Sequence, residues 1–274
     1  MRSNLLFSPF LNLPRLASGQ RVIAGDAAVG QACYDPSTFA DVTTLVAGRA
    51  SSAPPVDGRA RALLRMVWPS TVAQARLQWG RRFAGGGPIE DLMAAVIGIP
   101  AATLRAVAVR SAEATRAGDD EFARAAVPMA ALHEAIGFVV RTRASSPGRT
   151  ETVLDELLFW RGLGREQVSL DEVTALVTAL TAAAWDAAHA GPPPRTVGWL
   201  RVTAQAVVLD GATIPAGERC LLLVDAAEPT TGPARPALQT MRWLSPGAPN
   251  GAGSMFARLA HDAMRRDATQ TAAA

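Results

Sequence analysis

Through the middle of the chain, stretches of Ala and Leu mixed with Arg and acidic residues alternate with short breaks of Gly and Pro. This pattern predicts a run of helices. We expect them over residues 59–68, from Ser70 onward, and over residues 89–96, 101–117, 119–143, 151–161 and 169–190. Ser169 with Glu172 three residues later forms a capping box, which marks the start of the last of these helices. Gly191 and the three prolines that follow it end that helix.

Apolar, β-forming runs lie near both ends of this helical stretch. Residues 21–24 predict one strand, and residues 198–207, 208–209 and 220–225 predict three more, with Asp210-Gly211 as a tight turn. Residues 27–32 indicate a helical turn, residues 226–254 an irregular segment and residues 255–266 a last helix. We therefore expect one domain over residues 1–274. It is mainly α with a small β-sheet (α+β), with a helical body over about 59–190, a β-rich segment over about 198–225 and a sheet assembled from both chain ends.

Composition supports a buried core and excludes several classes of function. Hydrophobic residues make up 49% of the 274 residues, a fraction that is typical of a globular chain. The net charge of +3 comes from arginines scattered among acids, and this argues against a concentrated nucleic-acid-binding face. Cys33 and Cys220 form no CxxC pair and no His/Cys zinc cluster, which indicates a reduced, cytoplasmic setting. The first residues do not form a convincing signal peptide, and no run of about 18 apolar residues predicts a membrane span.

Several stretches resemble the bacterial cytochromes P450, in the family's order. They are RVIAGDAAVGQACYDPSTF (residues 21–39), PPVDGRARALL (54–64), DLMAAVIGIP (91–100) and LRVTAQAVVLDGATIPAGERCLLLV (200–224), supported by the capped helix from 169–180. The fourth is similar over its whole length to the family's "RVATEDVELGGVTIPAGERVLLLL". This resemblance implies a reduced cytochrome P450-like fold that lacks part of the central helices.

The family's haem-ligating loop is the place where this chain departs most. The family pattern is FGxGxHxCxGxxLAR, and the matching stretch is LSPGAPNGAGSMFAR, residues 244–258. Anchored on residues 256–258, the alignment puts Gly247 on a family glycine, Gly251 at the cysteine position and Pro249 at the histidine position. Glycine has no side-chain donor for iron, and the thiolate is what drives oxygen–oxygen cleavage. We therefore expect no haem, no metal and no monooxygenase activity.

Other family contacts to haem are also altered. Where relatives carry "HTR" for the haem propionates, this chain has Asp57-Gly58-Arg59, and an Asp repels a propionate. Arg201 matches a propionate-binding arginine of the family. The chain is shorter than typical relatives, with most of the gap between residues 185 and 198.

The end of the long helix that begins at Ser169 aligns with the family in two ways. In one alignment residues 183–187 match the central-helix motif AGHET, so Ala187 replaces the threonine that helps to protonate bound oxygen. In the other, residues 186–189 match ExxR. The first continues the register set by the capping box, and we favour it.

Candidate site residues cluster near this helix end. Asp186 is either a general acid or base facing the former haem pocket, or a charge partner of His189 three residues on. His189 is a candidate base near neutral pH or a local cap. We expect Thr181, Trp185 and Arg201 to line the pocket. The sequence has no nucleophile elbow, P-loop, GxGxxG or HExxH motif.

The resemblance implies two functions. Haem-less relatives act as non-redox auxiliary proteins that activate or stabilise glycosyltransferases in antibiotic and macrolide biosynthesis, and we favour this role. The alternative is a cofactor-independent cyclase, isomerase or dehydratase that uses the vacated haem pocket for a hydrophobic intermediate. The expected partners are a biosynthetic enzyme such as a glycosyltransferase, a hydrophobic small-molecule ligand and a second copy in a homodimer, without nucleic acid or membrane.

Overall fold

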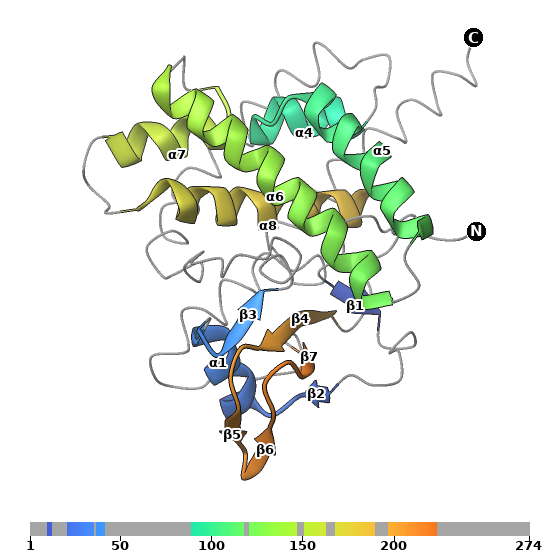
Figure 1. Cartoon of the computed structure of the whole chain (residues 1–274). Coiled ribbons are helices and arrows are strands. Elements are labelled where there is room, and N and C mark those ends of the chain that lie inside the picture. The colour runs from blue at the N-terminus through green and yellow to red at the C-terminus, as the bar shows by residue number, and fades with distance from the viewer. Residues whose placement is uncertain are drawn as a thin grey trace, which may run out of the picture.

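The computed structural model describes residues 10–12, 21–35, 37–41, 89–117, 121–146, 151–162, 168–189 and 197–223. Its helices are α1 (Asp26–Tyr34), α4 (Ile89–Ile97), α5 (Ala101–Ala117), α6 (Glu121–Ser145), α7 (Val153–Gly162) and α8 (Leu170–His189). Its strands are β1 (Phe10–Asn12), β2 (Arg21–Ile23), β3 (Phe39–Asp41), β4 (Val197–Thr203), β5 (Val207–Leu209), β6 (Ala212–Ile214) and β7 (Arg219–Leu222). Figure 1 shows the helices α4 to α8 on one side and the strands with α1 on the other. The predicted class, mainly α with a small β-sheet, is confirmed.

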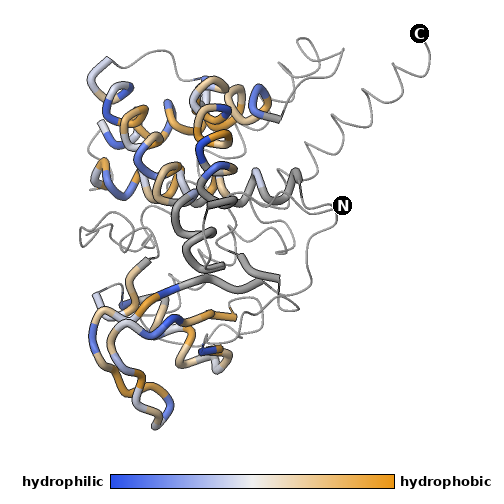
Figure 2. The backbone as a smooth tube through the Cα atoms, turned by 45° about the vertical axis from the view of Figure 1, so that its right-hand side comes forward, coloured by the Kyte–Doolittle hydropathy of each residue, from blue (hydrophilic) through white to orange (hydrophobic). Residues whose placement is uncertain are grey.

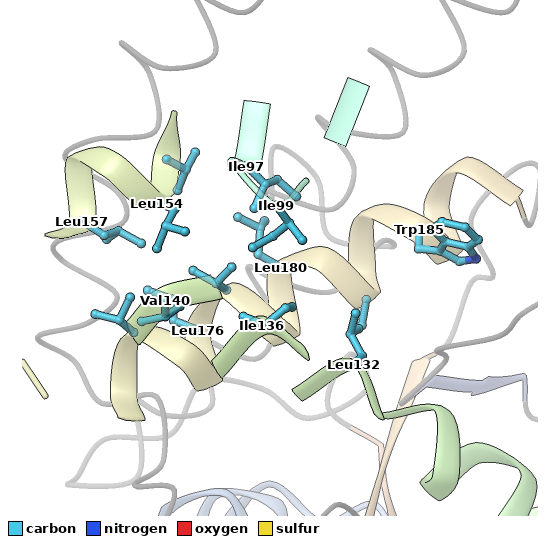
Figure 3. Packing of buried hydrophobic residues seen from close by; sticks show 14 of the residues in the cluster. Ile97, Ile99, Leu132, Ile136, Val140, Leu154, Leu157, Leu176, Leu180 and Trp185 are labelled. Carbon is cyan, nitrogen blue, oxygen red and sulfur yellow. The ribbon is translucent and has the colours of Figure 1, made fainter. Parts of the chain in front are cut away.

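Helices α4 to α8 pack around one apolar cluster. The predicted helices over 89–96, 101–117, 119–143, 151–161 and 169–190 are confirmed within two residues at each end. Leu132 and Ile136 of α6 and Leu176 and Leu180 of α8 are 0–1% exposed, and Figure 3 shows them meeting between the two helices. Fully burying one such side chain stabilises the fold by about 1.5–3 kcal/mol. Figure 2 shows hydrophobic and hydrophilic residues alternating along these helices, as one-sided packing requires.

The ends of two helices are fixed by local sequence. The Ser169 N–H donates to Glu172 Oε2 (2.5 Å) and the Glu172 N–H donates to Ser169 Oγ (3.1 Å), so the predicted capping box at the start of α8 is confirmed. Gly98 follows α4 with a φ of 97°, and its N–H donates to the Ala94 carbonyl (3.1 Å). A Cβ on Gly98 would collide with the side chain of Thr152, so both the backbone and the space require glycine.

The main sheet joins the two halves of the chain. Its order is β1-β4-β7-β2, with β3 also pairing to β4. The pairs are antiparallel except β2 with β7, which run parallel with Val22 opposite Leu221. The expected sheet built from both chain ends is therefore confirmed. Residues 27–32, predicted as a helical turn, belong to the longer helix α1, which follows β2 directly.

Strands β5 and β6 form the predicted hairpin. Asp210 (φ 48°) and Gly211 (φ 75°) turn the chain between them, as the Asp-Gly pair predicts. The predicted strand over 198–207 is too long, because β4 ends at Thr203. There the Thr203 hydroxyl donates to the Pro215 carbonyl (2.5 Å) and accepts from the Glu218 N–H (2.9 Å), which ties the strand end to the next turn.

Several predicted elements lie outside the described residues. These are the helices over 59–68 and from Ser70, the irregular segment 226–254 and the helix over 255–266. Within the described part of the chain, no helix is long and apolar enough to cross a membrane.

Candidate functional site

The second half of α8 carries four of the five predicted site residues. Thr181 and Trp185 lie four residues apart on one face of the helix and are 0% and 3% exposed. Asp186 and His189 lie in the last turns of the same uninterrupted helix, and their side chains are outside the described part of the structure. The acid–base roles of Asp186 and His189 therefore stay predictions. The helix is unbroken from Leu170 to His189, and the choice between the two alignments of its end stays a prediction.

A row of threonines runs along α8 toward this site. Thr174 Oγ1 donates to the Leu170 carbonyl (2.8 Å), and Thr178 Oγ1 donates to the Thr174 carbonyl (2.7 Å). Thr181 differs, because its fully buried hydroxyl has no hydrogen-bond partner among the residues that the structure describes. Leaving a hydroxyl buried and unsatisfied costs about 1–3 kcal/mol. A ligand with a polar group hydrogen-bonded to the Thr181 hydroxyl would recover this energy.

His133 connects the threonine row to α6. Its Nδ1 lies 3.3 Å from Thr178 Oγ1. Because Thr178 already donates its one hydroxyl hydrogen to Thr174, His133 Nδ1 is the donor in this contact. The bond fixes the position of α6 on α8, so His133 has a structural role.

Trp185 belongs to the hydrophobic cluster of the helical layer. Figure 3 shows it at one end of the cluster, on α8, beyond Leu180 and Leu132. Its indole is almost completely enclosed, so it contributes to the core as well as to the wall beside Thr181.

Arg201, the fifth predicted site residue, lies in the sheet instead. It is half-buried in β4, opposite Asp41 of β3 on one side and Cys220 of β7 on the other. Figure 1 shows β4 among the strands, on the side of the molecule away from α4, α5 and α7. The predicted site residues therefore divide between the end of α8 and the middle of the sheet.

Cys220 is a buried, free thiol in β7. Burial raises its pKa to about 11, the negative charge of Glu218 adds to the shift, and the positive charge of Arg21 opposes it. Near neutral pH the sulfur is therefore a protonated thiol, whereas metal ligation and nucleophilic attack need the thiolate.

The thiolate-ligated haem of the resembled family finds no accessible thiol among the side chains that the structure describes. Cys220 is 0% exposed inside the sheet, where a haem iron cannot reach its sulfur. No group of three or more His, Cys, Asp or Glu side chains among the described residues is placed to hold a metal ion. The loop 244–258, with Gly251, and residues 57–59 lie outside the described residues.

A polar cluster that the sequence analysis did not identify joins α6 to α7. Arg143 Nη1 lies 3.0 Å from Asp155 Oδ1, and the Thr152 hydroxyl donates to Asp155 Oδ2 (2.7 Å). The Asp155 N–H also donates to Thr152 Oγ1 (3.2 Å), so Thr152 caps α7. The Thr-x-x-Asp spacing was a visible signal for this cap. Because both carboxylate oxygens are engaged, Asp155 holds helices together and is not a free acid or base.

Comparisons with known proteins give only remote similarity. No protein-family model matches the chain, and no curated protein matches it. Among solved structures, the chain is similar to cytochrome P450 CREJ, with 14% identity, 94% of this chain and 86% of that chain covered, and a TM-score of 0.40. It is similar to the mycinamicin VIII C21 methyl hydroxylase MycCI from Micromonospora griseorubida, with 18% identity, 88% and 80% covered, and a TM-score of 0.40. It is also similar to a structure described among unusual cytochrome P450-like monooxygenases of microbial secondary metabolism, with 16% identity, 88% and 83% covered, and a TM-score of 0.44.

Proposed function

We propose that this protein is a haem-less cytochrome P450-like protein that acts as a non-redox auxiliary partner of a biosynthetic enzyme such as a glycosyltransferase. The observation that carries the proposal is the replacement of the haem-ligating cysteine by Gly251. The burial of Cys220 supports it, because that thiol is 0% exposed inside the sheet and is not accessible as a replacement ligand.

An exposed phenylalanine on α7, held against a partly buried tryptophan, supports a partner-binding role. Phe159 is 48% exposed, and its ring meets that of Trp160 edge to face, with 5.8 Å between centroids and 81° between planes. Trp160 is fixed in turn, because its Nε1 donates to Glu156 Oε2 (3.2 Å). Aromatic side chains held rigid at a surface are the commonest anchors of protein interfaces. We therefore assign Phe159 to the contact with the partner enzyme.

The test is a reconstitution with a glycosyltransferase encoded beside this protein. We expect the two proteins to co-purify and glycosyl transfer to fall when this protein is omitted. Phe159→Ala should weaken association at least about 10-fold, as the loss of an aromatic anchor does. Val109→Ala on α5, where the side chain is 59% exposed, is the matched control and should leave association unchanged. Full glycosyl transfer without this protein would contradict the auxiliary role.

Haem binding has a separate spectroscopic test. Purified protein mixed with haem and reduced under carbon monoxide should give no absorption band at about 450 nm, because that band requires thiolate ligation. A band at this position would overturn the proposed loss of haem chemistry, whatever the outcome of the glycosyltransferase assay.

A second candidate function rests on Thr181. Its buried hydroxyl without a partner, beside the indole of Trp185, would suit an apolar intermediate that carries one hydrogen-bonding group. In this function the protein is a cofactor-independent cyclase, isomerase or dehydratase, and Asp186 or His189 supplies the acid–base step. If Asp186→Ala and His189→Ala leave turnover of a candidate substrate unchanged, these catalytic roles are wrong.

A further inference from the structure

Helix α6 has two faces of opposite character. Its buried face carries Leu132, Ile136 and Val140, all 0% exposed, which belong to the core of the helical layer. Its exposed positions are spaced three or four residues apart, which places them in one stripe along the helix. They are Glu134, Phe138, Arg141, Thr142 and Ser145. Figure 1 shows α6 crossing in front of α8, so α6 forms the outer surface of this layer.

The centre of this stripe is apolar. Phe138 is 67% exposed, the largest fraction for a large hydrophobic side chain in the part of the chain that the structure describes. An exposed phenylalanine is costly in water, and covering it recovers apolar area.

Charges of opposite sign flank Phe138. Glu134 precedes it by four residues and Arg141 follows it by three, so the two charges stand about 10 Å apart along the axis with the ring between them. Among the residues that the structure describes, neither Glu134 nor Arg141 forms an ion pair. The stripe therefore presents one negative and one positive end, each without a partner in the described chain.

We propose that this stripe is a homodimer interface in which α6 pairs antiparallel with α6 of a second copy, about a two-fold axis between Gly137 and Phe138. A two-fold axis there brings Glu134 opposite the partner's Arg141, and Arg141 opposite the partner's Glu134. The two Phe138 rings meet at the centre. A two-fold rotation brings the negative end of one stripe against the positive end of the other, so the surface is complementary to itself. An isologous interface requires this self-complementarity.

The helix that carries the stripe is firmly held by its own chain. The contact from His133 to Thr178 fixes it on α8, and the ion pair from Arg143 to Asp155 fixes its end on α7. Gly137 faces α8, where an added Cβ would lie 3.5 Å from Thr174 Cγ2, an ordinary van der Waals distance, and 3.2 Å from Arg141 Nη1 of its own helix. A preorganised surface loses little entropy when it pairs.

Helix α5 offers a similar stripe that serves as a comparison. Val109 is 59% exposed, with Arg105 four residues before it and Glu113 four residues after it. Arg105 is already engaged, because its Nη1 lies 3.5 Å from Asp91 Oδ1 of α4. The α5 stripe therefore lacks a free positive end, and its central side chain is smaller than that of Phe138.

The experiment is sedimentation velocity on the full chain over a concentration series. We expect a monomer–dimer equilibrium. Phe138→Asp should raise the dimer dissociation constant at least about 100-fold, as loss of a central aromatic anchor does. Glu134→Lys or Arg141→Glu alone should raise it about 10-fold, because two attractive pairs become repulsive at a solvent-exposed interface.

Two further samples test the antiparallel register. The double variant Glu134→Lys with Arg141→Glu restores opposite charges across the axis and should dimerise like the unmodified chain. An equal mixture of the two single variants should form a mixed dimer, because each introduced charge then faces its opposite. Val109→Asp and Glu113→Lys on α5 are the matched controls and should leave the equilibrium unchanged. Circular dichroism verifies that each variant is folded.

Three results would overturn the proposal. One is a chain that stays monomeric at every concentration. Another is a dimer that the α5 variants weaken as much as the α6 variants do. The third is a double variant or mixture that fails to recover dimerisation, which would exclude the antiparallel pairing even if a dimer exists.

Discussion

The hydrogen bonds of the helical layer and those of the sheet join residues that are separated by very different distances along the chain. In the helical layer the main polar cluster joins Arg143, Thr152 and Asp155, which lie within 12 residues of one another. In the sheet Gln205 Nε2 donates to Thr38 Oγ1 across 167 residues, and the Leu223 N–H donates to the Ile23 carbonyl. The helices are joined by sequence neighbours and by contacts of intermediate range, such as that from His133 to Thr178 over 45 residues, whereas the sheet closes a loop that contains the entire helical layer. We expect this difference to govern how each region responds to substitution.

The largest expected effect is in the helical layer, at Gly98. Gly98→Ala forces a side chain into a left-handed backbone and against Thr152, and it should lower the free energy of unfolding by about 3 kcal/mol. Gly211→Ala is the counterpart in the β5–β6 hairpin, where φ is also positive but no atom lies within 4 Å of the added Cβ. That variant should cost only about 1 kcal/mol. Urea titration measures both, and equal losses would show that the contact with Thr152 contributes nothing.

Removal of the carboxylate that joins α6 to α7 should have the next largest effect. Asp155→Ala leaves Arg143 without its partner and removes the acceptor of the Thr152 hydroxyl, so we expect a loss of about 2 kcal/mol. The control is Asp91→Ala, since the pair from Asp91 to Arg105 is exposed on both sides and is worth about 0.5 kcal/mol. A loss at Asp155 no larger than at Asp91 would contradict the assigned role of the cluster.

A smaller effect is expected in the sheet. There a substitution at Thr203 tests whether the sheet unfolds independently of the helical layer. Thr203→Val removes the bonds to Pro215 and Glu218 and should cost about 1–2 kcal/mol. Amide hydrogen exchange should show faster exchange in β4 and β7 while α6 and α8 keep their protection, because the sheet is held by long-range contacts. Thr213→Val, at an exposed position of β6, is the control and should be neutral. Equal loss of protection in both regions would show that they unfold as one unit.

The smallest effects compare two threonines on α8. Thr178→Val removes the bonds to Thr174 and His133 and should cost about 1 kcal/mol. Thr181→Val replaces a buried hydroxyl that has no partner among the described residues, so it should leave the free energy of unfolding unchanged or raise it by up to about 1 kcal/mol. Thermal unfolding of both variants measures the difference. A cost at Thr181 equal to that at Thr178 would show that its hydroxyl is satisfied in the folded protein.

The sequence alone determined the helices and their ends, because the signals for them are local. The capping box at Ser169 and the Asp210-Gly211 turn act over two or three residues, and both formed as predicted. The same sequence placed Gly251 at the family's cysteine position, which needs no geometry. It also placed Thr181 and Trp185 together, since a four-residue spacing on a helix fixes a shared face.

Only the tertiary structure decided which residues, far apart in the sequence, lie on one surface or form an ion pair. Strand pairing places Arg201 between Asp41 and Cys220, whereas Thr181 and Trp185 lie on α8. No local pattern shows that Cys220 is a buried thiol, that Asp155 meets Arg143, or that the hydroxyl of Thr181 lacks a partner among the described residues while that of Thr178 has one. These facts depend on contacts between elements far apart along the chain. The physical reason is that burial and hydrogen bonding are settled by packing, whereas spacing along one helix or strand specifies only which side chains face the same way.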